Sequence, residues 1–530
     1  MRTVNFQTLI GMGVYLVIMI VIGIWYARRS NSSPEEYFLG NRGLGPWVAA
    51  ISAEASDMSG WLLMGLPGVA YFTGSCEAFW TAVGLAAGTW INWRIVAKRL
   101  RTYSQIANNA ITLPEFFSNR FHDTKRILMT IAAVMNLLFF SIYVGAQFVT
   151  FAKVFGYVFG AEQYYTAMVI LGAAIVLIYT LLGGFLAASM TDLIQGMLMI
   201  GAILLVLAAG FRYAGGFAGT LDKLRDFPRF LDIFGIAEPI DAAGAAVAGG
   251  TVQAIADGKP LFGAGSPYSL LNIVSCLAWG LGYFGMPQVL VRFMAIQNPG
   301  EIRNSRRIAV TWCGISLAAA VSIGLIGRAV FPALLTTAGA AEHIFLYLSQ
   351  DFFPAFLAGL VISGILAASM SSSDSYMLIV SSALANDLFK GLFKKDAGEI
   401  LVMRIARITM LMVTVFGITV ALSGNQSIFR IVSYAWAGLG ASFGPLILFS
   451  LFWKRTTLAG AVGGMASGGF MAVLWKEVIS KAGGVFGVYE LLPAFIISSL
   501  VIVLISLGAK PPSADITAEF EAAEKQSALP

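Results

Sequence analysis

The stretch Ser52-Ala-Glu-Ala-Ser-Asp-Met-Ser-Gly60 decides how this chain folds, because it is polar yet lies inside an apolar segment, residues 47–72, that is long enough to cross a bilayer. A carboxylate and several hydroxyls at membrane depth are costly unless they face a cavity or bind something. The stretch therefore predicts a membrane-spanning helix that is broken near its middle. Transporters place substrate and ion at such breaks, at the bilayer midplane.

The rest of the chain is equally apolar. Of its 530 residues, 58% are hydrophobic and 12% are charged, and the mean hydropathy is +0.79. Runs of roughly 20 apolar residues, each able to cross about 30 Å of hydrocarbon, recur along the whole length. The sequence predicts an all-α integral membrane protein with about thirteen transmembrane helices. The expected spans lie near residues 6–27, 47–72, 75–95, 127–150, 162–182, 187–211, 268–296, 308–332, 351–388, 402–422, 429–452, 457–478 and 490–508.

Lysine and arginine concentrate in alternate loops, for example in residues 94–101, 120–126 and 303–307. By the positive-inside rule these loops face the cytoplasm. The expected topology is a multi-pass protein of the plasma (inner) membrane with its N-terminus outside and its C-terminus in the cytoplasm. The net charge of +6 then reflects topology, so the lipid bilayer is the expected partner and nucleic acid is not. The sequence gives no sign of an obligate protein partner.

A second break is predicted within Trp279-Gly-Leu-Gly-Tyr-Phe-Gly-Met-Pro287. Three glycines weaken a helix here, and Pro287 removes a backbone donor. The two breaks fall in the second and seventh expected spans, so their helices cross the bilayer in opposite directions. That spacing is expected of two five-helix repeats related by inverted pseudo-symmetry. The alternative is that glycine and proline are simply common in membrane helices.

A third polar patch lies in the ninth expected span, from Ala368 to Ser375. Its residues 368, 371, 372 and 375 share one face of a helix. Such a stripe of hydroxyls can hold helices together, or it can supply oxygen ligands to a hard cation together with carbonyls freed in a broken neighbour. The adjacent Asp374 favours the cation.

Two segments outside the spans are expected to carry little fixed structure. The external loop 212–267 contains an Ala/Gly-rich stretch, 242–250, that predicts a flexible flap. The acidic tail after Pro512 predicts a frayed helix or a disordered segment.

Several motifs resemble the solute:sodium symporter family, and within it the sodium/proline branch. They are YFLGNRGLGPW (37–47), SAEASDMSGWLLMGLPG (52–68), WGLGYFGMPQVLVRFMA (279–295) and ILAASMSS (365–372). The resemblance implies a leucine-transporter-like core of two inverted five-helix repeats with discontinuous helices. The implied divisions are a first span and cytoplasmic loop (1–46), a first repeat (47–211), an external loop (212–267), a second repeat (268–452), two further spans (453–510) and a short cytoplasmic tail (511–530).

The resemblance also implies a sodium ion as the coupling ion, held between the broken second span and the ninth span. The implied ligands are the carbonyls of Ala55, Met58 and Ala368 and the hydroxyls of Ser371 and Ser372. Three acids are expected to act in ion coupling: Asp57 beside the break, Asp192 in the sixth span and Asp374.

The implied substrate is L-proline. The matching substrate positions are Ser59, Gly60, Tyr143, Trp279, Tyr283 and Pro287. Aromatic walls would bury the proline ring and offer a cation–π face to its ammonium group. Arg42 matches an arginine linked to the cytoplasmic side of the pathway.

Glu54 and Asp374 depart from the proline branch, and Asp374 matches choline-type members better. The leading hypothesis is a secondary active transporter that takes up L-proline with sodium by alternating access. The alternatives are another small solute (choline, another amino acid or a carboxylate), coupling to protons, and a sensor built on a transporter module. The chain is not expected to be an enzyme, since its two histidines form no evident catalytic or metal cluster.

Overall fold

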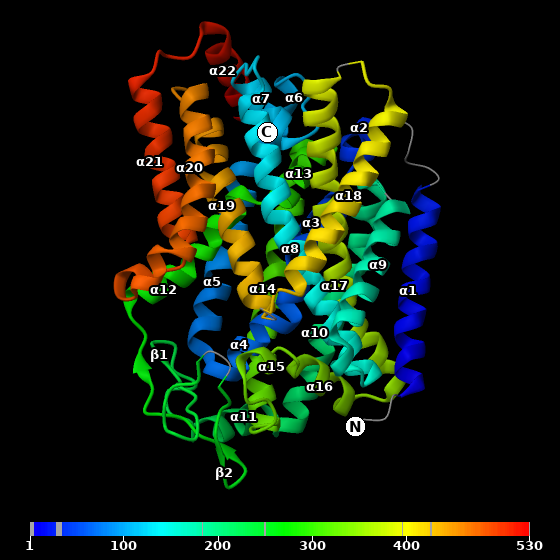
Figure 1. Ribbon diagram of the computed structural model, residues 1–530, viewed down its shortest axis with the longest axis vertical. Helices are drawn as coiled ribbons and strands as arrows, with labels where there is room; N and C mark the ends of the chain where they lie inside the picture. The colour runs from blue at the N-terminus through cyan, green and yellow to red at the C-terminus, as the bar shows by residue number, and fades with distance from the viewer. Residues whose placement is uncertain are drawn as a thin grey trace.

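The computed structural model describes residues 5–27, 34–182, 184–248, 251–394, 396–424 and 427–528. It is a bundle of long helices that run along one axis, with the N-terminus near one end and the C-terminus at the other (Figure 1). The end that carries α6 (Ala97–Ile106), α7 (Leu113–Arg120) and the C-terminal helix α22 (Ala514–Ala528) is called the tail end here. The end that carries α11 (Gly216–Leu224), α15 (Ala338–Ala341), α16 (Ile344–Phe352) and the strands is called the loop end.

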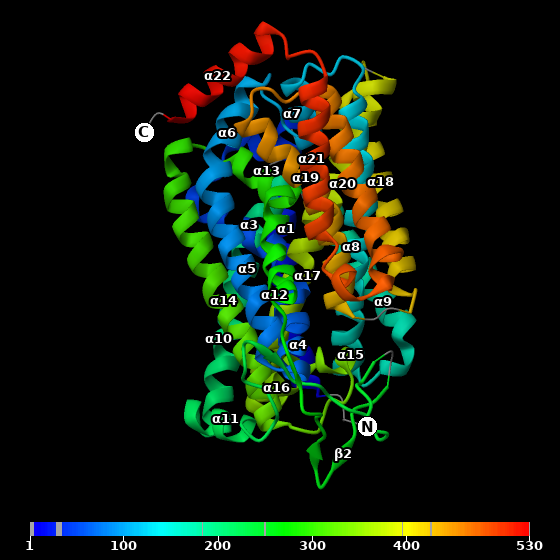
Figure 2. The same ribbon diagram turned by 90° about the vertical axis from the view of Figure 1, so that its left-hand side faces the viewer.

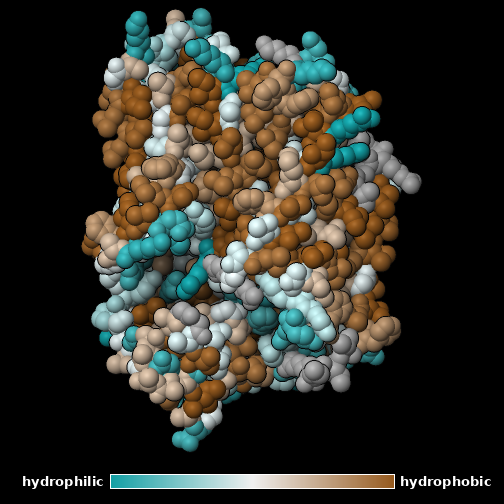
Figure 3. Space-filling model, in the orientation of Figure 1, coloured by the Kyte–Doolittle hydropathy of each residue, from teal (hydrophilic) through white to brown (hydrophobic). Residues whose placement is uncertain are grey.

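Ten helices in the described residues are long and apolar enough to cross a membrane, or eleven if a pair bent by 43° forms one span. Their outer surface forms an apolar belt between two more hydrophilic ends (Figure 3). The ten are α1 (Phe6–Ala27), α8 (Ile127–Phe159), α9 (Tyr165–Leu182), α10 (Phe185–Ala214), α14 (Ile302–Val330), α17 (Ala355–Ser382, continued by η7, Ala383–Phe393), α18 (Glu399–Ala421), α19 (Ile428–Phe452), α20 (Leu458–Glu477) and α21 (Leu491–Gly508).

The bent pair matches the seventh expected span. It consists of α12 (Leu270–Leu277) and η5 (Ala278–Gly285), followed by α13 (Pro287–Ala295). Met286 between them is extended, with φ −84° and ψ 103°, and Pro287 begins α13. A proline fits the first turn of a helix because its missing N–H is not needed there. The predicted break in this span is therefore present.

The second expected span is also interrupted. It consists of α3 (Pro46–Asp57), a π-helical turn η2 (Trp61–Gly65) and α4 (Leu66–Thr73). Ser59 has a φ of +25°, outside the helical region. The third expected span is continuous: α5 (Ser75–Ile91) passes through a π-helical turn η3 (Asn92–Val96) into α6 (Ala97–Ile106) without a break. Neither the second nor the third expected span is among the ten helices that are long and apolar enough to be counted above. The total of thirteen spans therefore stays a prediction.

The segment 212–267, predicted to be an external loop, has regular secondary structure outside its Ala/Gly-rich stretch. It contains α11 (Gly216–Leu224) and two antiparallel strand pairs, β1 (Gly235–Ile236) with β4 (Ser266–Pro267) and β2 (Ile255–Ala256) with β3 (Lys259–Pro260). Phe227, Phe230 and Phe262 form a small core beneath it. The Ala-rich stretch itself pairs through Ile240 and Ala246, although residues 249 and 250 lie outside the described residues.

The acidic tail is a helix, α22 (Ala514–Ala528), that lies across the tail end against α6 (Figure 2). Phe520 is buried there, with the guanidinium of Arg120 5.3 Å from its ring centroid. Glu524 pairs with Arg99 at 3.1 Å. The prediction of a frayed or disordered tail was wrong, because the charges and one aromatic residue give the helix a complementary surface to dock on.

Candidate functional site

The first break faces the middle of α17. The hydroxyl of Ser371 donates to the carbonyl oxygen of Ala55 on α3 at 2.8 Å and to that of Ala368 at 3.1 Å. The neighbouring hydroxyl of Ser372 is fully buried and has no hydrogen-bond partner among the described residues. Two carbonyls and two hydroxyls thus gather where a helix is interrupted, a donor set that suits a hard cation.

Met58, the remaining predicted sodium ligand, lies at the end of α3. Its carbonyl oxygen accepts a hydrogen bond from the amide of Leu62 at 3.1 Å, across the break. A carbonyl oxygen has two lone pairs, so this bond leaves one free.

Asp57 joins the two breaks. Tyr283, from the second break, donates its hydroxyl to Oδ2 of Asp57 at 2.7 Å. Gln288, from the first turn of α13, donates to Oδ1 at 3.2 Å. Both halves of the bent pair are therefore bonded to one buried carboxylate on α3.

Ser59, Gly60 and Tyr143 also meet at the first break. Tyr143 on α8 donates its hydroxyl to the backbone carbonyl of Asp57 at 3.5 Å, and the amide of Gly60 donates to the side chain of Gln147 at 3.3 Å. The hydroxyl of Ser59 accepts from the amide of Trp61 at 3.2 Å. α8 is therefore the third wall of the polar centre.

Trp279 lies within a cluster of aromatic rings. Its ring centroid is 5.4 Å from that of Trp61, 5.4 Å from that of Phe429 and 5.1 Å from that of Tyr489. The indole of Trp436 donates to the backbone carbonyl of Trp279 at 2.9 Å. Trp279 thus belongs to an aromatic wall beside the breaks rather than to the hydrogen-bonded centre around Asp57.

Phe429, one ring of this aromatic wall, is also bonded through its backbone amide to a buried carboxylate at the loop end. Glu342, between α15 (Ala338–Ala341) and α16 (Ile344–Phe352), accepts from the amides of Ile428 and Phe429, each at 3.1 Å. The same carboxylate pairs with Lys153 of α8 at 2.5 Å. A negative charge at a helix N-terminus is favourable, so Glu342 fastens the first turn of α19 and closes this side of the bundle.

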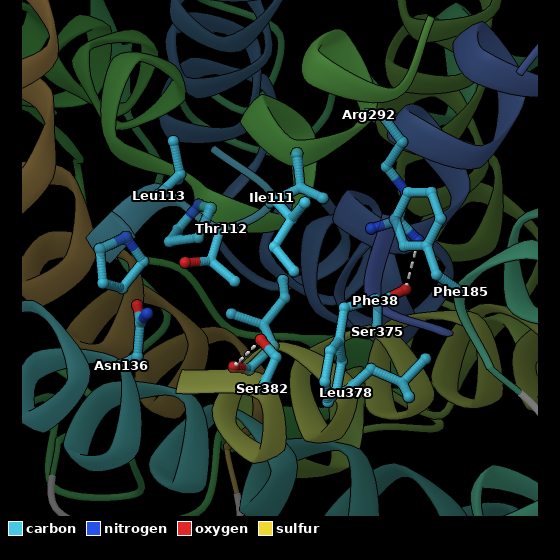
Figure 4. Close-up of a pocket in the computed structure, with 14 residues that line it drawn as sticks. Phe38, Ile111, Thr112, Leu113, Asn136, Phe185, Arg292, Ser375, Leu378 and Ser382 are labelled. Atoms are coloured by element: carbon cyan, nitrogen blue, oxygen red, sulfur yellow. Dashed lines mark hydrogen bonds between the residues drawn. The ribbon is translucent and has the colours of Figure 1, made fainter. Parts of the chain in front are cut away.

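Pro287 lies apart from the other predicted substrate residues. It lines a separate narrow cavity toward the tail end, together with Asn136, Thr112, Arg292 and Ser375 (Figure 4). The helix α7 (Leu113–Arg120) begins at this cavity. Pro287 therefore lies on the tail-end side of the second break, beside this cavity and apart from the aromatic wall.

A buried ionic network forms part of the wall of that cavity. Asp192 on α10 pairs with Arg292 of α13 at 3.0 Å, and the hydroxyl of Ser52 donates to the same carboxylate at 2.7 Å. Arg292 also donates to Ser375 at 2.6 Å (Figure 4). Asp374 accepts from Ser375 at 3.4 Å, and its other oxygen has no partner among the described residues. Two of the three predicted acids thus meet here.

Arg42 fastens the tail end of α13. Its guanidinium donates to the carbonyl of Met294 at 2.7 Å, to that of Ala110 at 2.8 Å and to the side chain of Ser104 at 3.1 Å. Burial, with a smaller contribution from the charge of Arg101, lowers the pKa of Arg42 to about 10, so it stays protonated at neutral pH. Its predicted role on the cytoplasmic side of the pathway stays a prediction.

Arg292, Gln288 and Gln147 were not predicted from the sequence as parts of the site. Each lies inside an apolar segment, and a charged or amide side chain at that depth is itself a sign of function. Arg292 in particular stands in the run Val-Leu-Val-Arg-Phe, where no other polar residue explains it.

An all-helical membrane protein whose two interrupted spans meet at a buried polar centre has the architecture of a secondary transporter. Three solved structures agree with this class. They are a Na⁺-coupled sialic acid symporter in an outward-open state (TM-score 0.73, 18% identity, covering 96% of this chain and 100% of that chain), the nucleobase-cation-symport transporter Mhp1 (0.50, 12%, 93% and 99%) and MhsT in complex with L-phenylalanine (0.50, 15%, 88% and 99%). These likenesses confirm the leucine-transporter-like fold.

The chain belongs to the Sodium:solute symporter family, whose sequence pattern matches residues 37–468. It is 40% identical to the sodium/proline symporter of Escherichia coli (strain K12) over 515 residues, which cover 96% of this chain and 95% of that protein. It is 37% identical to the osmoregulated proline transporter OpuE of Bacillus subtilis (strain 168) over 510 residues, or 96% of each chain. The protein is therefore a sodium-coupled solute symporter and not an enzyme.

Proposed function

We propose that this symporter takes up L-proline with sodium by alternating access. The observation that carries the proposal is the joint at Asp57, where both broken spans meet beside a set of oxygen donors, in a chain that is 37–40% identical to proline transporters. Sodium and proline are the expected cargo, and the lipid bilayer surrounds the helices during alternating access.

The proposed sodium site lies between α3 and α17. Its ligands are the carbonyls of Ala55, Met58 and Ala368 and the hydroxyls of Ser371 and Ser372. The unpartnered hydroxyl of Ser372 supports this assignment, because a buried hydroxyl without a partner is costly unless something binds it. Asp57 supplies negative charge nearby without being a ligand.

The proposed proline site lies between the breaks and the aromatic wall. Ser59, Gly60 and Tyr143 form its floor, and Tyr283 and Trp279 form its side. Tyr283 is the residue that connects the two sites, since its hydroxyl already bonds Asp57. Trp279 presents a face for the pyrrolidine ring and its ammonium group.

The coupling follows from this shared framework. Sodium bound between α3 and α17 orders the first break, and the hydroxyl of Tyr283 carries that order to the second break. Binding free energies are reciprocal, so sodium must raise the affinity for proline by the same factor by which proline raises the affinity for sodium. Release toward the tail end would then pass Pro287 and the network of Asp192 and Arg292.

We further propose the plasma membrane as the location, with the N-terminus outside and the tail end in the cytoplasm. The support is the concentration of Lys and Arg at that end, including residues 94–101 of η3 and α6 and residues 303–307 at the start of α14. Release toward the tail end is then release into the cell. The divisions at residues 1–46, 47–211, 212–267, 268–452, 453–510 and 511–530 remain predictions on this topology.

Equilibrium binding in detergent tests the site and its specificity. Radiolabelled L-proline binding is measured with sodium and with potassium at one pH, and choline, other amino acids and carboxylates are added as competitors. We expect proline to bind only with sodium and to be displaced by proline analogues alone. Displacement by choline in preference to proline would replace the substrate, and equal binding in potassium would favour coupling to protons, for which Asp374 is the candidate.

The serine pair tests the ion site. The variant Ser371→Ala/Ser372→Ala is expected to need at least tenfold more sodium for half-maximal proline binding, because two oxygen ligands are lost. The matched control is Ser322→Ala, on the exposed face of α14, where the hydroxyl bonds only the carbonyl of Ala318. An unchanged sodium requirement in the double variant would remove the assignment.

A further inference from the structure

A groove of ≈ 580 Å³ opens on the outside of the bundle at the tail end. It lies between the segment η3–α6 and the start of α14, and Figure 2 shows α5, α6 and α14 side by side at one edge of the molecule. Four of the residues that line it are cations: Arg94, Lys98, Arg303 and Arg306. None of the lining residues is an acid.

Three of these cations are arginines whose charges are not balanced by carboxylates in the described part of the chain. In the part of the chain that the structure describes, Arg94, Arg303 and Arg306 have no carboxylate within 4.0 Å, while Arg306 has the like charges of Arg94, Arg303 and Arg307 beside it. The contrast with the rest of the tail end is clear, because Arg99 and Lys454 are paired with Glu524 and Glu521 of α22. Like charges held around one groove are stabilised by an anion that enters it.

The surroundings of the groove identify the kind of anion. Trp90, Ile91 and Ile95, on the same segment as Arg94, are exposed by 51%, 36% and 41%, and Ile315 of α14 is exposed by 43%. Large apolar side chains on the outer face of a membrane bundle contact acyl chains, and tryptophan favours the headgroup level. A ligand that reaches both surfaces needs an anionic head and apolar chains.

We propose that this groove binds the headgroup of one anionic phospholipid, with the phosphodiester held by Arg94, Arg303 and Arg306. Basic pockets between transmembrane helices at the positively charged side of a membrane protein are suited to such headgroups. The arginine guanidinium fits a phosphate oxygen pair better than an ammonium group does. The acyl chains lie along Trp90, Ile91 and Ile95.

The floor of the groove gives the lipid a connection to the transport site. Trp93 is buried, and its indole donates to Oε1 of Glu54 on α3 at 3.2 Å. The same ring lies 4.4 Å from that of Phe293 on α13, measured between centroids. The lipid therefore sits on a residue that contacts both broken spans, and its occupancy is expected to change the rate of uptake.

Native mass spectrometry of the purified full chain tests the site. The protein is titrated with phosphatidylglycerol, with phosphatidylcholine of the same acyl chains, and with inorganic phosphate as a competitor. We expect one phosphatidylglycerol to bind saturably per chain, at least tenfold more tightly than phosphatidylcholine and without displacement by millimolar phosphate. Equal binding of the two lipids, or ready displacement by phosphate, would overturn the proposal.

Three variants make the test specific. Arg94→Gln/Arg303→Gln/Arg306→Gln is expected to lose the saturable binding at least tenfold, whereas Arg94→Lys/Arg303→Lys/Arg306→Lys retains most of it. The matched control Lys390→Gln/Arg404→Gln/Arg407→Gln removes the same charge from η7 and α18 and is expected to bind as the wild type does. Thermal unfolding checks that each variant is folded. A folded glutamine variant of the groove that still binds one phosphatidylglycerol with wild-type affinity would contradict the proposal.

Discussion

At the scale of single residues, Asp57 is the side chain that connects the two broken spans. Its carboxylate accepts from Tyr283 at 2.7 Å and from Gln288 at 3.2 Å, so one side chain on the first break holds both halves of the second. A buried charge that is fully hydrogen-bonded fixes the groups around it. Any ligand that alters the position of α3 must therefore alter the second break as well.

Replacing Asp57 by asparagine tests this joint. Asp57→Asn keeps the size of the side chain but removes its charge, so the sodium concentration for half-maximal proline uptake is expected to rise at least tenfold. The maximal rate at saturating sodium should fall less. Uptake is measured against sodium concentration, with the exposed Asp222→Asn as control. A wild-type sodium dependence would show that Asp57 has no part in ion coupling.

Position 60 leaves no room for a side chain larger than that of glycine. A Cβ atom at this position would lie 2.6 Å from Cγ2 and Oγ1 of Thr150 and 2.9 Å from the hydroxyl of Ser369. Gly60→Ala is therefore expected to abolish most uptake and to destabilise the fold by about 1–3 kcal/mol, the usual cost of overpacking. Gly60→Ala/Thr150→Ala should recover part of both.

Gly201 is the matched control for this prediction, because a Cβ atom there meets nothing within 4 Å. Gly201→Ala on α10 should transport as the wild type does. Full activity of Gly60→Ala alone, measured by uptake and thermal unfolding, would show that the break is wider than this packing indicates.

At the scale of elements, α13 is held at several points. Gln288 bonds Asp57 of α3, Arg292 pairs with Asp192 of α10, and Arg42 bonds the carbonyl of Met294. The half-helix beneath the second break is thus tied to the first break and to the tail end. If cargo leaves toward the tail end, as we propose, at least one of these contacts must open.

The pair of Arg292 and Asp192 gives a direct test of that contact. Removing one partner of a buried ion pair leaves an uncompensated charge and typically costs about 3–5 kcal/mol. Arg292→Gln alone is expected to lower the unfolding temperature strongly, and Asp192→Asn/Arg292→Gln to recover much of the loss. Thermal unfolding of the two single variants and the double variant measures the coupling, and additive effects would mean that the two groups act independently.

At the scale of the whole molecule, the tail helix α22 closes one end. Glu519, Glu521 and Glu524 meet His122, Lys454 and Arg99, and Phe520 is buried beneath them. None of these residues belongs to the proposed binding sites, so we expect the contact to contribute to stability and not to the binding of cargo.

Removing the tail tests that separation. A chain that ends at Pro512 exposes the site of Phe520 and leaves Arg99 unpaired, so its unfolding temperature is expected to fall. The affinity for proline should stay within about twofold of wild type, since burying one aromatic side chain is worth about 2–3 kcal/mol of stability but touches no cargo ligand. A large loss of proline affinity would place α22 in the transport path.

Local chemistry explains how much of this could be predicted from the sequence. The breaks at Ser59 and before Pro287 were predictable, because polar residues, glycine and proline interrupt an apolar helix wherever it lies. The contact of Ser371 with Ala55 was predictable only through the family resemblance. The pairing of Asp192 with Arg292 joins residues 100 positions apart, and nothing local reports it. The docked tail was missed for the same reason, since its partners come from distant loops.

Proline uptake into proteoliposomes tests the central claim most directly. Radiolabelled L-proline accumulation is measured with an inward sodium gradient, and again with potassium in place of sodium at constant pH and with an imposed pH gradient. We expect proline to accumulate above equilibrium only with the sodium gradient. Accumulation in potassium driven by the pH gradient, or no proline accumulation under any gradient, would contradict it.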